Sequence, residues 1–131
     1  MQTKNLSPEM VSLKWSLPKT MLHLEGGVVL VAAATLYATQ GYSWLLFALL
    51  FFAPDLFMLG YLRGKEFGSM VYNLGHTYAV PLLLVGLSLL TGWAGLMPVA
   101  IIWSAHIGMD RAVGYGLKYP DSFQSTHLSR V

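Results

Sequence analysis

Long apolar segments dominate the chain from residue 21 onward, and short polar stretches separate them. Each segment is close to the roughly 20 residues that a helix needs to cross a hydrocarbon core about 30 Å thick. The pattern predicts four transmembrane helices, Met21–Thr39, Trp44–Leu62, Met70–Leu90 and Trp93–Lys118. Residues 44–54 do not alternate between apolar and polar positions, which favours helices over the strands of a membrane barrel.

Short connections at residues 40–43 and 91–92 predict antiparallel neighbours. The chain is 55% hydrophobic and 11% charged, whereas soluble domains carry about 25% charged residues. This composition excludes an ordinary water-soluble domain. We therefore expect an all-α, integral membrane four-helix bundle. Its three parts would be an interfacial segment at residues 1–20, the helical domain at 21–118 and a polar tail at 119–131.

Basic residues mark one side of the predicted bundle. They precede the first helix, separate the second from the third and follow the fourth: Lys4, Lys14, Lys19, Arg63, Lys65, Lys118 and Arg130. The positive-inside rule places this side in the cytoplasm. We expect a multi-pass protein of the inner (plasma) membrane with both termini cytoplasmic and no cleaved signal peptide. Residues 8–18 would lie along the headgroup surface.

Polar residues inside the predicted spans are the candidates for function, because they are costly in lipid and normally pair or line a cavity. Six ionisable residues at these depths form the candidate set: Glu25, Asp55, His76, His106, Asp110 and Arg111. At about 1.5 Å per residue, the acids and histidines fall in one layer about two helical turns thick. This common depth predicts that all four helices contribute to one polar site.

The residue types in this layer indicate a metal site. His106 and Asp110 are at i and i+4 and project from one helix face. Pro54 would kink the second helix beside Asp55. The chain has no cysteine, so ligands must be nitrogen or oxygen. Asp55, His76, His106 and Asp110 predict a divalent metal ion, zinc first, with iron(II) or manganese(II) as alternatives.

Neighbouring residues complete the predicted site. Asn73 and Tyr72 precede His76 by three and four residues and would hydrogen-bond its imidazole. Glu25 is expected to act catalytically by accepting a proton from metal-bound water. Arg111 points about 100° around the helix from the residue before it. We expect it to bind an anionic substrate.

Structural interpretations of the same residues remain open at this point. A single buried histidine can pack and bond a backbone carbonyl, and His106 with Asp110 can form a hydrogen-bonded pair. Asp55 can cap the kinked helix or pair with Arg111. Glu25 can favour the dipole at a helix N-terminus, and Arg111 can extend toward headgroups.

Several sequence blocks resemble those of a known family. They are Pro54–Leu56, Gly60–Tyr61, Tyr72–Thr77, Ala105–Arg111, Gly114–Tyr119 and Thr126–Leu128. They are similar to the bacterial domain-of-unknown-function family 4260 over about residues 22–130. This resemblance implies a membrane protein and brings no established activity.

The chain is also similar, more loosely, to membrane-bound metal-dependent hydrolases. These have a Pro-Asp, a His and a His-x-x-x-Asp on successive helices, matched here by Asp55 after its proline, His76, and His106 with Asp110. Phe57 stands where those hydrolases usually have a further Asp. The similarity implies metal-dependent hydrolysis as an analogy.

Three classes of function fit these observations. The first is a membrane metalloenzyme, a hydrolase that uses a metal-activated water on a lipid or other amphiphile. The second is a small proton- or cation-coupled carrier, although four short helices without an inverted repeat offer little for alternating access unless the chain oligomerises. The third is a non-catalytic structural membrane protein. The expected partners are membrane lipids and an amphiphilic substrate, with a homo-oligomer left open and no nucleic acid.

Overall fold

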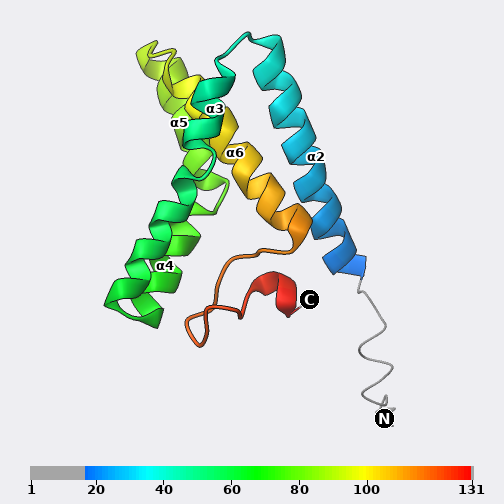
Figure 1. Ribbon diagram of the computed structural model, residues 1–131, viewed down its shortest axis with the longest axis vertical. Coiled ribbons are helices and arrows are strands. Elements are labelled where there is room, and N and C mark those ends of the chain that lie inside the picture. Colours follow the sequence, from blue (N-terminus) through cyan, green and yellow to red (C-terminus); the bar gives the residue numbers. More distant parts are fainter. Residues whose placement is uncertain (1–16, 131) are drawn as a thin grey trace.

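The computed structural model describes residues 17–130, and the regular elements in this range are helices, followed by a non-helical tail with one isolated β-bridge between Lys118 and Thr126 (Figure 1). The elements in chain order are α2 (Leu17–Thr39), α3 (Trp44–Leu50), the 3₁₀ segment η1 (Ala53–Arg63), α4 (Lys65–Gly75), α5 (Ala79–Thr91), α6 (Leu96–Val113) and the short η2 (His127–Ser129). The all-α prediction is therefore confirmed. Most of the predicted interfacial segment at residues 1–20 lies outside the described residues.

Two helical segments of the described chain are long and apolar enough to cross a membrane, Leu17–Thr39 and Trp44–Arg63. A third span results if α4 and α5, which meet at an angle of 44°, are taken together. The fold is thus that of a membrane protein with two or three candidate spans. A fourth crossing, by α6, stays a prediction, as does the orientation of the termini.

Large apolar side chains cover the outer faces of these helices. Leu24 and Val28 on α2, Leu45 and Leu49 on α3 and Leu82 on α5 are all more than half exposed. A water-soluble monomer rarely exposes so many large apolar residues together. Lipid tails are the solvent that suits these faces.

The second predicted helix changes character where the sequence places a proline. α3 ends at Leu50, a turn follows, and η1 begins at Ala53 with Pro54 in its first turn. Proline cannot donate to the helical ladder and its ring crowds the preceding turn. The predicted kink at Pro54 is present, and it takes the form of a change from α-helical to 3₁₀ geometry.

The third predicted helix, Met70–Leu90, is not continuous. α4 ends at Gly75 and α5 begins at Ala79. Pro81 has no N–H to donate to the carbonyl of Thr77, and Val80 bonds that carbonyl instead at 3.3 Å. The single uninterrupted helix was therefore a wrong prediction. Its break places His76 at the end of a helix rather than within one.

α6 is the central helix of the fold, with α2 packed along one side and α5 along another (Figure 1). Its crossing with α2 is close because both helices have a glycine at the contact. A Cβ on Gly26 would lie 2.4 Å from the Cβ of Arg111, and one on Gly108 would lie 2.7 Å from the Gly26 oxygen. Small residues of this kind let membrane helices approach closely.

The C-terminal tail folds back against α4 instead of extending away. The Asn73 amide donates to the Lys118 carbonyl at 2.8 Å, and its oxygen accepts from the Lys118 N–H at 2.6 Å. The Leu117 N–H donates to Nδ1 of His127 at 2.8 Å. The Asn73 side chain therefore holds the tail and makes no hydrogen bond to the His76 imidazole, which corrects its predicted role; the Asn73 carbonyl accepts the His76 N–H at 3.2 Å.

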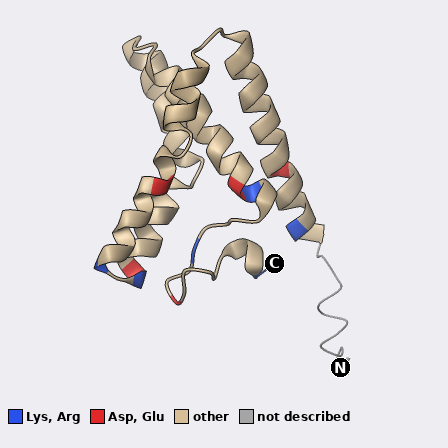
Figure 2. Ribbon diagram, viewed as in Figure 1, with Lys and Arg blue, Asp and Glu red and all other residues tan. Residues whose placement is uncertain are grey.

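Charged residues gather at one end of the molecule. In Figure 2 the lysine, arginine, aspartate and glutamate residues of the described chain all lie in the lower half, and the upper half is free of them. This distribution follows the depth argument made from the sequence. The polar layer and the tail share the charged end.

Candidate metal centre

Four of the predicted polar residues converge at one point of the structure. They come from three places along the chain: Asp55 from the first turn of η1, His76 from the break after α4, and His106 with Asp110 from α6. Each offers one ligand atom, and these atoms all lie within 4.8 Å of one another. We call these four residues the ligand group. A group of this composition could hold a metal ion.

The distances within the ligand group are short and uniform. His76 Nε2 is 3.2 Å from Asp55 Oδ1 and 3.5 Å from Asp110 Oδ2. His106 Nε2 is 3.3 Å from each of the same two oxygens. The two Nε2 atoms are 3.4 Å apart. Five of the six separations among four atoms therefore fall between 3.2 and 3.5 Å.

These separations match the edges of a metal-centred tetrahedron. Ligand atoms about 2.0–2.2 Å from a zinc ion, at tetrahedral angles, are about 3.3–3.6 Å from one another. The observed separations of 3.2–3.5 Å agree with this expected range to within about 0.1 Å. The group therefore has the size of a first-row metal site before any adjustment of its side chains.

Burial divides the ligand group unequally. The side chains of His76 and His106 are fully buried and that of Asp110 is 6% exposed, whereas that of Asp55 is 33% exposed. Three members are thus sealed inside the protein. Asp55 is the member that an approaching molecule meets first.

The proton on His76 can be assigned from its surroundings. Nδ1 lies 2.8 Å from the carbonyl oxygen of Tyr72, which can only accept, so Nδ1 carries a hydrogen. In the neutral ring Nε2 then has a bare lone pair, and that lone pair faces the carboxylate oxygens of Asp55 and Asp110. Ligating histidines commonly donate their other N–H to a backbone carbonyl in this way. The arrangement favours a cation between these atoms.

His106 presents its Nε2 to the same point from the opposite helix. Its Nδ1 is buried and makes no hydrogen bond with the described residues. The Phe51 ring contacts the imidazole edge-on, with centroids 5.5 Å apart. Aromatic packing therefore orients His106, and hydrogen bonding orients His76.

The helix break beside His76 is held by side chains of α6. The Arg111 guanidinium donates to the His76 carbonyl at 2.8 Å and to the Tyr115 carbonyl at 2.9 Å. Trp103 Nε1 donates to the Gly75 carbonyl at 2.7 Å. In a continuous helix the carbonyls of Gly75 and His76 would accept from backbone N–H groups further along. The break frees them, and α6 satisfies them, which fixes His76 relative to His106.

Tyr72 adds a stacking contact behind the same histidine. Its ring is nearly parallel to the His76 imidazole, at an interplanar angle of 11° and a centroid distance of 3.8 Å. The ammonium of Lys118 lies 4.7 Å from the centre of the Tyr72 ring. Tyr72 was predicted to support His76, and it does so through its ring and its carbonyl.

A cavity of about 300 Å³ opens onto the ligand group. Asp55 and Asp110 form its polar floor, and Lys118 supplies one cation. Apolar and aromatic side chains make up the remaining wall: Phe52, Met58, Tyr72, Met109, Tyr115 and Phe123. We call this space the site cavity. It gives a molecule with both polar and apolar parts direct access to Asp55.

Glu25 and Arg111, the two residues predicted to act on substrate, lie outside the site cavity. They line a separate cavity of about 450 Å³ beside α2, together with Tyr78. Glu25 is exposed on the surface of α2. Arg111 is buried, with donors on both terminal nitrogens bound to carbonyls, so it does not extend toward headgroups. The structure brings together the four predicted ligands. It leaves Glu25 apart from them, and Arg111 contacts the group only through the backbone carbonyl of His76.

Sequence reasoning missed two residues that shape the site. Trp103 and Lys118 had no signal beyond residue type, because their contacts depend on the break after α4 and on the tail folding back. The break itself had a signal in Gly75 and Pro81, both unfavourable within a helix. Taken together, Gly75 and Pro81 predict that the helix ends near His76.

The fold and the ligand group define a class: a small all-α membrane protein with a buried His and Asp group of metal-site dimensions. The sequence profile of one family, described as Domain of unknown function (DUF4260), matches residues 19–131. The chain therefore belongs to the DUF4260 family. No curated protein and no solved structure matches it.

Proposed function

We propose that this chain is an integral membrane metalloenzyme of the inner (plasma) membrane. Asp55, His76, His106 and Asp110 bind a divalent metal ion, zinc in the first place. One observation carries the proposal: five of the six separations between the ligand atoms are 3.2–3.5 Å, the spacing of a tetrahedral site of about 2.0–2.2 Å bonds. Iron(II) and manganese(II) are the alternatives for the same donor set.

The proposed reaction is hydrolysis of a lipid or other amphiphile. A zinc ion lowers the pKa of a bound water to about 7, which supplies hydroxide at neutral pH. The site cavity supports this chemistry because it reaches the ligand group through Asp55, its most exposed member. Its apolar walls suit the hydrocarbon part of such a substrate.

The number of protein ligands favours a second candidate, a structural metal site. Structural zinc sites have four protein ligands, whereas catalytic sites usually have three and keep one position for water. In the hydrolase, water must enter as a fifth ligand or displace Asp55. The 33% exposure of the Asp55 side chain supports that route.

Metal analysis tests the shared part of both candidates. We expect the full chain, purified in a mild detergent, to contain about one metal ion per molecule, and His106→Ala and Asp110→Asn to contain none. Asp121→Asn is the matched control, because Asp121 is an exposed tail carboxylate paired with Arg130. Equal and negligible metal in all four proteins would overturn the proposal.

The two candidates differ in what happens to Asp55. In a hydrolase, Asp55→Asn should keep the metal with reduced affinity, and the loaded variant should unfold at nearly the wild-type temperature. In a structural site, the same variant should lose metal and stability together, as buried structural sites do. Thermal unfolding with and without added zinc separates the two outcomes.

A further inference from the structure

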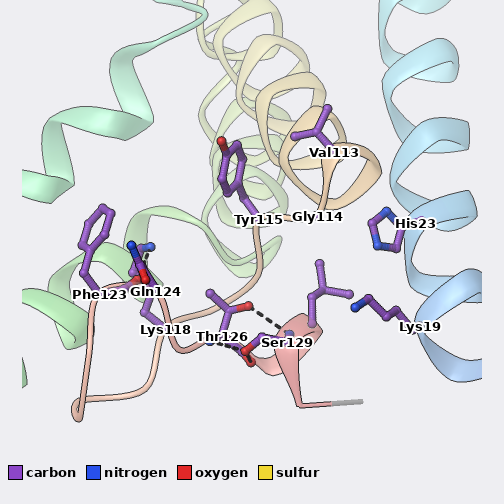
Figure 3. A pocket seen from close by; sticks show the side chains of 11 residues that line it. Lys19, His23, Val113, Gly114, Tyr115, Lys118, Phe123, Gln124, Thr126 and Ser129 are labelled. Atoms are coloured by element: carbon purple, nitrogen blue, oxygen red, sulfur yellow. Dashed lines mark hydrogen bonds between the residues drawn. The ribbon is translucent and has the colours of Figure 1, made fainter. Parts of the chain in front are cut away.

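A second cavity adjoins the site cavity on the side of the tail. It has a volume of about 410 Å³ and lies between α2 and the folded-back C-terminal segment (Figure 3). Lys19 and His23 line it from α2, and polar side chains including Thr126 and Ser129 line it from the tail. We call this space the tail cavity. Tyr115, Lys118 and Phe123 line both cavities and form their common wall.

Lys118 in this common wall carries a buried charge. It is 7% exposed, and its ammonium donates to the Phe123 carbonyl at 2.7 Å and lies 3.6 Å from the centre of the Phe123 ring. Among the described residues, no carboxylate lies within ion-pair distance of it. A buried ammonium without an anionic partner costs free energy. It also has three N–H donors, more than this one hydrogen bond uses.

The charges that line the site cavity do not balance when a divalent ion is bound and no hydroxide is on it. The site cavity is lined by two carboxylates, Asp55 and Asp110, and by Lys118. A divalent ion on the ligand group neutralises the two carboxylates. The positive charge of Lys118 is then not balanced. When a substrate takes the place of the metal-bound water or hydroxide, the positive charge of Lys118 at the common wall therefore lacks a counter-charge in the site cavity.

The remaining walls limit which anion fits. Phe52, Met58 and Met109 provide apolar surface on the site-cavity side. A small free anion would leave this surface uncovered, and an uncharged lipid would leave the ammonium uncompensated. An amphiphile that carries an anionic group would cover the apolar surface and compensate the ammonium. A lysine ammonium binds a phosphate oxygen as a compact point charge.

We propose that the two cavities together bind a phosphodiester amphiphile, with its anionic group on Lys118 at the common wall and its hydrocarbon part against Phe52, Met58 and Met109. This inference rests on the proposed function, because the anion would set the reactive bond beside the ligand group. It names the substrate class that the hydrolase would take. Lys118 is then a residue that determines substrate specificity.

Binding of soluble short-chain lipids tests the proposal. The zinc-loaded full chain in dodecyl maltoside would be titrated with dihexanoyl phosphatidylglycerol, with dihexanoylglycerol and with inorganic phosphate. We expect the phosphodiester lipid to bind at least about tenfold more tightly than either of the others, the size of one charge-assisted contact. If the neutral lipid binds as tightly, the site does not recognise the anionic group. If inorganic phosphate binds as tightly, the site does not recognise the hydrocarbon part.

Variants of the common wall locate the anion. Lys118→Met keeps the apolar stem and should weaken phosphatidylglycerol binding about tenfold, and Lys118→Arg should restore most of it. Lys65→Met is the matched control, because Lys65 is an exposed lysine that lines neither cavity. Unchanged affinity in a folded Lys118→Met protein would overturn the assignment.

A measurement on the wild-type chain covers the case in which Lys118→Met does not fold. Raising the salt concentration should weaken binding of phosphatidylglycerol and leave that of dihexanoylglycerol unchanged. Equal salt dependence of the two would overturn the inference. The metal content separates it from the proposed function: a wild-type chain without metal defeats the hydrolase itself, whereas a zinc-loaded chain without lipid preference defeats this inference alone.

Discussion

Nε2 of His76 and Nε2 of His106 lie 3.4 Å apart, and each is within 3.5 Å of Asp110 Oδ2. Because Nδ1 of His76 donates to a carbonyl, a neutral His76 turns a lone pair toward the other nitrogen and the carboxylates. Electron-rich atoms at this spacing require a shared cation, which is either a set of protons or a metal ion. This choice leads to the first prediction.

Zinc binding should release protons. Without metal, protons must neutralise part of the ligand group, and zinc displaces them, so the apparent affinity should fall as the pH is lowered from 8 to 6. Calorimetric titrations in two buffers of different ionisation enthalpy measure the number of protons released. His106→Ala should show no zinc-linked release. An affinity that does not change with pH would contradict a site made of these residues.

Arg111 should act on the metal through the backbone of His76. Arg111→Met removes the donors to the His76 and Tyr115 carbonyls, and we expect zinc affinity to fall about 10–100-fold, as for other groups that orient a ligand. Arg111→Lys keeps one donor and should lose less. Arg130→Met is the control, because that arginine is exposed and pairs with a tail carboxylate. If Arg111→Met binds zinc with wild-type affinity, the guanidinium does not orient His76 for metal binding.

Neighbouring glycines on α2 provide a paired test of the α2–α6 contact. An added methyl at Gly26 would meet Arg111, whereas one at Gly27 would meet no atom within 4 Å. Gly26→Ala should therefore destabilise the chain by about 1–3 kcal/mol. Gly27→Ala should be neutral or stabilising by up to about 1 kcal/mol, from its higher helix propensity. Thermal unfolding in detergent compares them, and equal midpoints would show that the helices do not meet at Gly26.

The sequence was sufficient to predict the helices and the ligand group. Apolar runs bounded by polar turns predict where the helices lie, although the second and third predicted helices are each divided in two and the fourth ends at Val113 instead of Lys118. His106 and Asp110 follow from one helical turn, which is local geometry. Asp55 and His76 follow from common depth in a membrane, where few ionisable residues are tolerated. These are constraints that a single sequence contains.

The remaining features depend on contacts between distant segments. Arg111 bonds the carbonyl of His76 only because α4 ends there, and Asn73 meets Lys118 only because the tail turns back. Neither contact has a periodic pattern in the sequence. Glu25 shares the depth of the ligand group but faces outward from α2, and depth alone does not specify the face of a helix.

The tail should loosen at mildly acidic pH. Burial and the positive charge of Arg111 lower the pKa of His127, whose Nδ1 accepts the Leu117 N–H. A histidine with a lowered folded-state pKa binds fewer protons folded than unfolded, so its contribution is complete above pH of about 6.5 and is lost below it. Hydrogen exchange of residues 117–128 should be faster at pH 5.5 than at pH 7.5, after correction for intrinsic rates.

His127→Asn is the matched variant for the tail. Its amide oxygen can accept the Leu117 N–H and does not titrate in this range. We expect its protection to be the same at both pH values. If the variant keeps the wild-type pH dependence, another group controls the tail.

Glu25→Gln separates the ligand group from the rest of the polar layer. Glu25 is exposed on α2 and lines the cavity of Tyr78 and Arg111, away from the four ligand atoms. The variant should therefore keep its zinc, whereas Asp110→Asn loses it.

We also expect hydrolysis of a short-chain phosphodiester lipid by Glu25→Gln to fall less than about tenfold, because a proton acceptor must lie within hydrogen-bonding reach of the reacting water. The Asp55 carboxylate, one-third exposed, is then the acceptor. A loss of about 10²–10⁴-fold with full zinc content would instead make Glu25 the base. That result would require α2 to move Glu25 toward Asp55 when substrate binds.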